Sequence, residues 1–166
     1  MILGRILKPE LIRLELETSP LEPPEESVDH ERLLWDIKEA ALAELAALVA
    51  ESGRIGSVKR LTTDLINREK KATTGLSHGV AIPHVRTREA REFIAAFARS
   101  TPGIDFDCLD GEPAHAFIVL VAPPYDDTLY LRIYKQLAEA IAFHDAARQL
   151  REAQDEGEVI RVFKQM

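Results

Sequence analysis

The chain of 166 residues contains a single cysteine, Cys108, and no run of apolar residues long enough to cross a membrane. One cysteine forms neither an internal disulfide nor a zinc site built on several thiolates. A membrane-spanning helix requires roughly 18 consecutive apolar residues, and the apolar start at residues 1–3 is shorter than the core of a secretory signal. We therefore expect a soluble protein of the reducing cytoplasm, with no membrane insertion.

Positive charge is also in the minority. The chain has 21 Lys and Arg against 28 Asp and Glu, a formal charge of −7, and 46% of its residues are hydrophobic. Because phosphate backbones select basic surfaces, this balance argues against nucleic acid as a partner. The length and composition are typical of one globular domain, which we expect to span residues 1–166.

The first third of the chain predicts a strand, an acidic loop and a long helix. Residues 12–16 alternate apolar and charged side chains, which is typical of a half-buried strand. Residues 17–31 contain three prolines and six acids but no Lys or Arg, which favours an exposed loop. A helix with apolar residues at helical spacing follows, with Ser27 or Asp29 as its N-cap and Gly53 at its C-terminal end.

Helices and strands then interleave. A second helix is predicted to begin at Ser57 and to end near the basic residues 68–71. The remaining predictions are strands at 79–82, 93–98 and 116–121, turns at 101–103 and 110–111, a helix capped by Asp127 or Thr128, and two shorter helices at the end of the chain. This order of elements predicts a layered α/β fold in which helices pack on a central sheet.

Of the five histidines, His84 is the best candidate for a catalytic role. It directly follows Pro83 at the end of a short apolar strand, and strand ends are where α/β folds usually place ligand chemistry. A neutral imidazole there can serve as a general acid–base or accept a phosphoryl group on a ring nitrogen. We expect His30 and His144 to lie at the surface and His115 to be structural.

Basic charge is concentrated around His84, which favours the role of phosphoryl acceptor. Residues 59–91 contain eight Lys or Arg and three Asp or Glu, a net charge of +5, so the remaining residues together carry −12. Cations near the ring would stabilise a phosphoryl anion. A cluster of this kind also occurs on solvated helix faces, so the charge alone leaves both interpretations open.

Residues 68–84 carry a resemblance to a known family. They read Arg-Glu-Lys-Lys-Ala-Thr-Thr-Gly-Leu-Ser-His-Gly-Val-Ala-Ile-Pro-His. This segment resembles the active-site segment of fructose/mannitol-type enzyme IIA domains of the bacterial phosphoenolpyruvate:sugar phosphotransferase system, a family that includes nitrogen-regulatory IIA proteins. The shared pattern is Arg-Glu, a short gap, Ser/Thr-Gly, a glycine-containing turn and then Ala-Ile-Pro-His. Residues 104–106, 109–113 and 117–121 also resemble the family.

The resemblance implies a fold, a chemistry and a set of partners. The fold would be a layered sandwich with a central mixed β-sheet flanked by helices. His84 would accept a phosphoryl group from the histidine-containing phosphocarrier protein. In transport members the group then passes to a cysteine of a IIB domain, whereas in nitrogen-regulatory members the phosphorylation state controls binding to a regulatory target protein. This chemistry needs neither a metal nor an organic cofactor.

The same match suggests roles for the neighbours of His84. Arg68 would pair with phosphate oxygens, or would be a cation facing the dipole at a helix end. Thr74 would donate its hydroxyl or its backbone N–H to the phosphoryl group, or would cap a turn. Gly75 and Gly79 would permit close backbone approach or positive φ. Arg86 would be a further neighbour of the site.

The chain departs from the family pattern at two positions. Members commonly carry a second histidine at the start of the helix after strand 117–121, and Tyr130 is the matching residue here. A phenol donates a hydrogen bond but carries no positive charge near neutral pH, so the stabilisation of phosphohistidine would be altered. His78 stands where the family more often has a small or polar residue, and it either partly replaces the missing imidazole or lies exposed in the turn.

Two other functions and a metal site are alternatives to the phosphocarrier. The main alternative is a non-catalytic regulatory module that binds a partner stoichiometrically, which the missing second histidine and the acidic insertion favour. A hydrolase with His84 as its base lacks an accompanying nucleophile or metal motif. A metal site on His78 and His84 lacks a further cluster of ligands, so we expect no metal.

Overall fold

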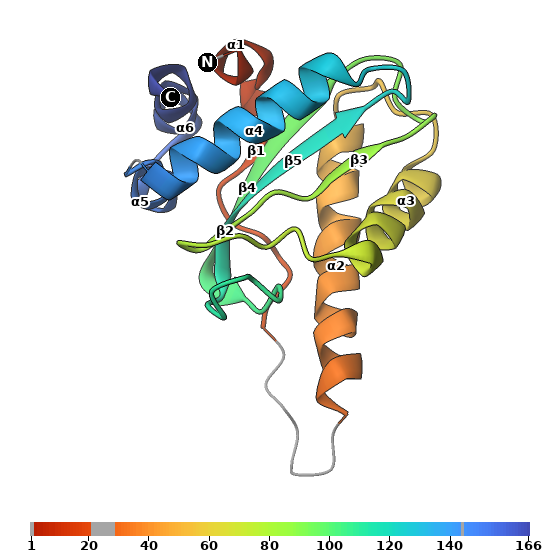
Figure 1. Ribbon diagram of the computed structural model, residues 1–166, viewed down its shortest axis with the longest axis vertical. Helices are drawn as coiled ribbons and strands as arrows, with labels where there is room; N and C mark the ends of the chain where they lie inside the picture. The colour runs from red at the N-terminus through yellow and green to blue at the C-terminus, as the bar shows by residue number, and fades with distance from the viewer. Residues whose placement is uncertain (1, 21–28, 144) are drawn as a thin grey trace.

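A five-stranded mixed sheet forms the centre of the protein (Figure 1). The computed structural model describes residues 2–20, 29–143 and 145–166. The strands are β1 (Ile12–Arg13), β2 (Val80–Ala81), β3 (His84–Arg86), β4 (Ile94–Ile104) and β5 (Ala114–Ala122). β4 and β5 pair antiparallel, β1 runs parallel to β4, and both β2 and β3 run parallel to β5. The expected α/β fold with a central mixed sheet is confirmed.

Helices cover both faces of this sheet (Figure 1). α2 (His30–Ala50) and α3 (Val58–Lys71) lie on one face, and α4 (Thr128–Phe143), α5 (Ala146–Glu152), α6 (Glu156–Gln165) and the short α1 (Leu3–Ile6) lie on the other. The side chains of β5 alternate between the two layers. Phe117, Val119 and Val121 pack with α2 and α3, whereas Ile118, Leu120 and Ala122 pack on the opposite side. This double coverage explains why residues 116–122 of the strand are all apolar.

Side chains at the helix starts settle the predicted N-caps. Asp29 accepts hydrogen bonds from two backbone N–H groups in the first turn of α2, and Ser57 accepts one from the N–H of Arg60 in α3. α4 begins at Thr128, directly after Asp127, as predicted, and the side chain that accepts from the N–H of Leu129 in its first turn is that of Asp126, at 3.2 Å. Asp127 instead forms an ion pair with Arg86, which draws its carboxylate away from the helix.

The predicted turn at residues 101–103 is wrong, since these residues belong to β4. The register between β4 and β5 shifts between Arg99 and Ile104, so the extra residues form a bulge. Gly103 adopts a φ of 81° there. Proline and glycine are tolerated in strands at such irregularities, where the ladder of hydrogen bonds is interrupted. Turn-forming residues therefore mark a bend within one long strand.

The N-terminal segment holds the other differences. The strand expected at 12–16 is reduced to Ile12–Arg13, and it follows two unpredicted elements, α1 and the 3₁₀-helix η1 (Pro9–Leu11). Of the expected loop at 17–31, residues 17–20 are irregular and residues 30 and 31 begin α2. Residues 21–28 and residue 144 lie outside the described residues, and with them Ser27 and His144. Among the described residues, no helix combines the length and the apolar character that a membrane span requires.

Candidate active site around His84

His84 lies where the two helical layers meet at one edge of the sheet. It is the first residue of β3, opposite Leu120 of β5, and only 7% of its surface is exposed. β3 pairs with β5 on one side, and no strand in the described part of the chain covers its other side. The imidazole at this open edge can therefore contact residues from both helical layers. Arg68 approaches from the end of α3, and the rings of Tyr130 and Tyr134 approach from α4 with centroid distances of 5.6 and 4.5 Å.

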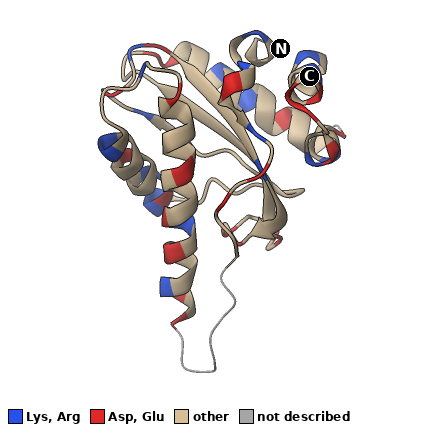
Figure 2. Ribbon diagram, turned by 180° about the vertical axis from the view of Figure 1, so that it is seen from behind, with Lys and Arg blue, Asp and Glu red and all other residues tan. Residues whose placement is uncertain are grey.

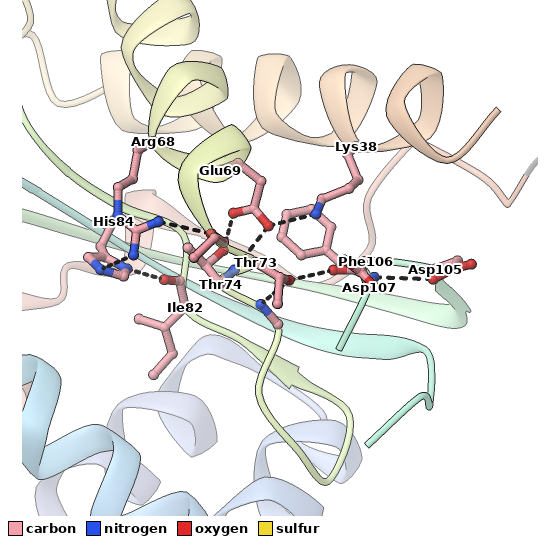
Figure 3. Close-up of polar contacts among 12 residues, drawn as sticks. Lys38, Arg68, Glu69, Thr73, Thr74, Ile82, His84, Asp105, Phe106 and Asp107 are labelled. Atoms are coloured by element: carbon pink, nitrogen blue, oxygen red, sulfur yellow. Dashed lines mark hydrogen bonds and ion pairs between the residues drawn. The ribbon is translucent and has the colours of Figure 1, made fainter. Parts of the chain in front are cut away.

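Two hydrogen bonds assign the protons of the imidazole ring (Figure 3). Nδ1 lies 2.6 Å from the carbonyl oxygen of Ile82, and a carbonyl oxygen only accepts, so Nδ1 carries the proton. In the neutral ring Nε2 then holds a lone pair, and it lies 3.3 Å from the guanidinium group of Arg68, which can only donate. Nε2 is therefore the nucleophilic nitrogen of the site.

The surroundings keep this ring neutral. Burial lowers the pKa of His84 below its usual value of 6.5, and the positive charge of Arg68 lowers it further. The hydrogen bond to Ile82 and the negative charge of Glu69 act in the opposite direction, and burial dominates. A lowered pKa leaves the lone pair on Nε2 available near neutral pH, as a nucleophile requires.

We expect an NMR titration of the His84 ring to show a midpoint below 6.5. Since the folded protein then binds this proton less readily than the unfolded chain, His84 weakens the fold as the pH falls below 6.5 towards the folded pKa. The Arg68→Gln variant should titrate at a higher pH than the wild type but still below 6.5, because burial is the larger cause. Lys59→Gln removes a cation from the same groove, so an equal upward shift in that variant would contradict the specific effect of Arg68.

Arg68 and Glu69 lie in the last turn of α3 and hold opposite sides of the site. The Arg68 side chain donates to the carbonyl of Ala72 at 2.9 Å as well as approaching His84. Glu69 is buried and accepts both the N–H and the hydroxyl of Thr74, at 2.9 and 2.5 Å. The two donors of Thr74 that were predicted to reach a phosphoryl group are thus directed to Glu69. In this structure Thr74 stabilises the turn that follows α3.

Lys38 completes this buried cluster from α2. Its Nζ lies 2.8 Å from Oε1 of Glu69, and both side chains are at most 2% exposed. The sequence motif contained Glu69 without assigning it a role, and Lys38 was not singled out. A lysine within the apolar pattern of a helix could have pointed to Lys38 in the sequence. That pattern does not identify the partner of the lysine.

The glycine-containing turn before β2 lets backbone segments approach closely and adopt positive φ angles. A Cβ atom on Gly75 would lie 2.7 Å from Sγ of Cys108 and 3.0 Å from the carbonyl oxygen of Phe106, so close approach requires glycine. Gly79 has a φ of 75° and its carbonyl accepts two N–H groups of β5. His78 is exposed in this turn with a φ of 57° and does not line the groove that holds His84. Its exposed position was one of the two predicted alternatives.

Tyr130 lies near His84, where the match to the family placed it. Burial raises the pKa of its hydroxyl to about 12, against the lowering effect of Arg68 and Arg86, so it stays neutral. The guanidinium group of Arg86 lies 5.8 Å from the centroid of the Tyr130 ring and also pairs with Asp127. Arg86 and Tyr130 therefore form one wall of the site, although neither bonds to the imidazole.

An open groove of about 1180 Å³ gives access to His84. Cations outnumber acids among the residues that line this groove. Several of them belong to α3, and Figure 2 shows basic residues at both ends of that helix. The lining cations are Lys59, Arg60, Arg68, Lys71, Arg86 and Arg88, and the acids are Asp64 and Glu89. Six of the eight cations of residues 59–91 thus line one groove together with the histidine. Within the described ranges, no three His, Cys, Asp or Glu side chains gather as a metal site would need.

Known proteins resemble this chain over most of its length. A nitrogen regulatory protein of Bradyrhizobium diazoefficiens is 35% identical over 119 residues, 71% of this chain and 76% of that protein. A phosphotransferase-system fructose-specific EIIA component of Haloferax volcanii is 34% identical over 117 residues, 70% of this chain and 76% of that protein. The fructose-specific EIIABC component of Bacillus subtilis is 29% identical over 128 residues, but the match spans only 20% of its length.

A solved structure and a family profile agree with these relatives. The nitrogen regulatory protein IIA-Ntr of Neisseria meningitidis is 26% identical and superimposes with a TM-score of 0.79, covering 98% of this chain and 99% of that one. Residues 25–166 match the profile described as phosphoenolpyruvate-dependent sugar phosphotransferase system, EIIA 2. Because this match covers most of the chain, the protein belongs to the EIIA 2 family of the phosphoenolpyruvate-dependent sugar phosphotransferase system.

Proposed function

We propose that the protein is a phosphocarrier that accepts a phosphoryl group on Nε2 of His84. The observation that carries this proposal is the hydrogen bond from Nδ1 to the carbonyl of Ile82, which leaves the lone pair of Nε2 directed at Arg68 beside a basic groove. The donor is the histidine-containing phosphocarrier protein, and the protein works in the cytoplasm as one domain spanning residues 1–166. Neither a metal nor a cofactor takes part.

The transfer is a displacement at phosphorus. The lone pair of Nε2 forms the new N–P bond, while the N–P bond in the donor breaks and its electron pair returns to the donor imidazole. Nδ1 keeps its proton and its bond to Ile82, so positive charge that develops on the ring is stabilised by that carbonyl. Arg68 gives up its contact with Nε2 as the N–P bond forms, and its guanidinium group can then pair with the phosphoryl oxygens.

The acceptor downstream is either a IIB component or a regulatory target protein. The relatives are named for both uses, a fructose-specific component and nitrogen regulatory proteins. The name of the Bacillus subtilis relative joins A, B and C components in one chain. An open basic groove suits docking of a second protein around the histidine, since donor and acceptor atoms must be brought into line.

The proposal is tested by incubating the full chain with phosphoenolpyruvate, enzyme I and the histidine phosphocarrier. We expect mass spectrometry to show one acid-labile phosphoryl group per chain, and NMR to place it on Nε2 of His84. Adding a IIB domain should remove the label if the protein relays it, whereas a regulatory protein keeps it. Absence of labelling under conditions that label an active relative would overturn the proposal.

Tyr130 is the observation that favours a second candidate, a regulatory module that binds its partner without phosphoryl transfer. Its neutral ring lies 5.6 Å from that of His84, at the place where the family commonly has a histidine. A stable complex with a partner that forms equally well with wild type and with His84→Gln would favour this candidate.

Replacing Tyr130 by histidine tests how the site tolerates this difference. In Tyr130→His an imidazolium can pair with the phosphoryl group, and one charge-assisted hydrogen bond is worth about 1.5 kcal/mol. We expect the phosphorylated variant to hydrolyse about tenfold more slowly than phosphorylated wild type. Tyr130→Phe, which loses the hydroxyl, should hydrolyse fastest of the three. Equal hydrolysis rates in all three proteins would contradict a role for this position.

A further inference from the structure

Lys38 is a charged group in a part of the core where lysine is rarely found. Its side chain leaves α2 and ends between the rings of Trp35 and Phe106, with Nζ 4.9 Å from each centroid. Its single carboxylate partner among the described residues is Glu69, at 2.8 Å. A lysine buried to this degree needs such a partner, because an unpaired charge in the core is strongly disfavoured.

A continuous chain of short contacts connects this pair to the histidine (Figure 3). Oε1 of Glu69, which accepts from Lys38, also accepts the N–H of Thr74. The carbonyl of Thr74 accepts the N–H of Ile82 at 2.9 Å. The carbonyl of Ile82 in turn accepts the proton on Nδ1 of His84. Each link is a hydrogen bond or an ion pair between groups that are largely shielded from water.

Two neighbouring residues in the last turn of α3, Arg68 and Glu69, thereby act on the two nitrogens of the ring. Arg68 faces Nε2 directly. Glu69, the next residue, acts on the other side through Thr74 and the Ile82 carbonyl that bonds Nδ1. The carboxyl group of Glu69 meets three donors at once, the ammonium group of Lys38 and the N–H and hydroxyl of Thr74, so Lys38 fixes the orientation in which Glu69 binds Thr74.

We propose that Lys38 is a positioning residue for phosphoryl acceptance. It fixes the orientation of the Glu69 side chain, so that the turn at residues 72–76 keeps the Ile82 carbonyl directed at Nδ1 and the lone pair on Nε2. This inference rests on the proposed function. Stability alone gives little reason for the pair, because well-packed apolar side chains of similar volume often replace a buried ion pair at no cost.

The test compares the His84 ring in wild type, Lys38→Met and Lys70→Met by ¹⁵N NMR. Lys70 is the matched control, since it is an exposed cation beside Glu69 that makes no ion pair with it within the described part of the chain. In wild type and Lys70→Met we expect one tautomer, protonated on Nδ1. In Lys38→Met we expect a mixture of tautomers, and phosphorylation about tenfold slower than in the control. A folded Lys38→Met protein with the wild-type ring signature, or with a rate within threefold of the control, overturns the inference.

A charge-neutral double variant decides the matter if Lys38→Met does not fold. Lys38→Met combined with Glu69→Gln removes both charges, and the amide oxygen can still accept the N–H of Thr74. Because no ion pair then orients the side chain at position 69, we expect this protein to fold with a mixture of tautomers, whereas a folded double variant with the single tautomer protonated on Nδ1 overturns the inference. The tautomer is read without a phosphoryl donor, so failure of this inference is distinguishable from failure of the proposed phosphocarrier function.

Discussion

Replacing His84 by alanine should abolish phosphorylation of the chain by the histidine phosphocarrier. We expect the rate to fall by at least about 1,000-fold, because among the described residues His84 is the only imidazole that lines the groove. Arg68 and Arg86 carry no lone pair to donate, and the hydroxyl of Tyr130 has a pKa raised to about 12. The measurement is the fraction of chain carrying an acid-labile phosphoryl group after incubation with the donor system.

His78→Ala is the matched control for this experiment. His78 is exposed and lies six positions earlier, in the turn before β2, and it does not line the groove around His84. We expect His78→Ala to be phosphorylated within about twofold of the wild-type rate, as is usual for a surface substitution away from the chemistry. Labelling of His84→Ala at an appreciable rate, or its loss in His78→Ala, would show that the acceptor lies elsewhere.

Glu69→Ala should destabilise the fold more than any substitution on the surface of the protein. It leaves the ammonium group of Lys38 buried without a counter-ion and removes the acceptor for both donors of Thr74. Breaking a buried pair by removing one partner costs about 3–5 kcal/mol. That is a large part of the roughly 5–15 kcal/mol by which a domain is stable. Urea denaturation followed by circular dichroism measures the loss.

An exposed ion pair on α4 provides the control for Glu69→Ala. Lys135 and Glu139 are separated by one helical turn and are 77% and 60% exposed, with 3.9 Å between the charged atoms. Because water solvates both groups, Glu139→Ala should lower the free energy of unfolding by no more than about 0.5 kcal/mol. Similar losses in Glu69→Ala and Glu139→Ala would contradict the burial of the Lys38–Glu69 pair.

Elements with strong local signals were predictable from the sequence. The strand expected at 116–121 lies within β5. A short apolar run bounded by prolines strongly indicates a buried strand. α2 and α3 begin after Asp29 and Ser57 because these side chains satisfy N–H groups that would otherwise lack partners. His84, Arg68 and Tyr130 were also predicted to share a site, and the structure brings them together.

What was missed depends on contacts between distant segments. β3 is three residues long and follows a proline, so neither periodicity nor length marks it as a strand. Residues 101–103 have turn chemistry, yet pairing with β5 draws them into β4. For Thr74 two roles stayed open, donation to the phosphoryl group or capping of a turn, because the motif does not show that Glu69 would bind both of its donors. The role of Lys38 depends on its ion pair with Glu69, which lies 31 positions away in the sequence.

The strands at the two edges of the sheet are very short. β1 and β2 have two residues each and β3 has three, whereas the central β4 and β5 have eleven and nine. A long open edge invites another chain to add a strand, and such pairing is slow to reverse. A phosphocarrier must bind a donor, release it and then meet an acceptor on every cycle. Edge strands this short offer a partner protein no long row of backbone groups to pair with, so it binds side-chain surfaces instead. Such binding favours brief encounters and rapid turnover.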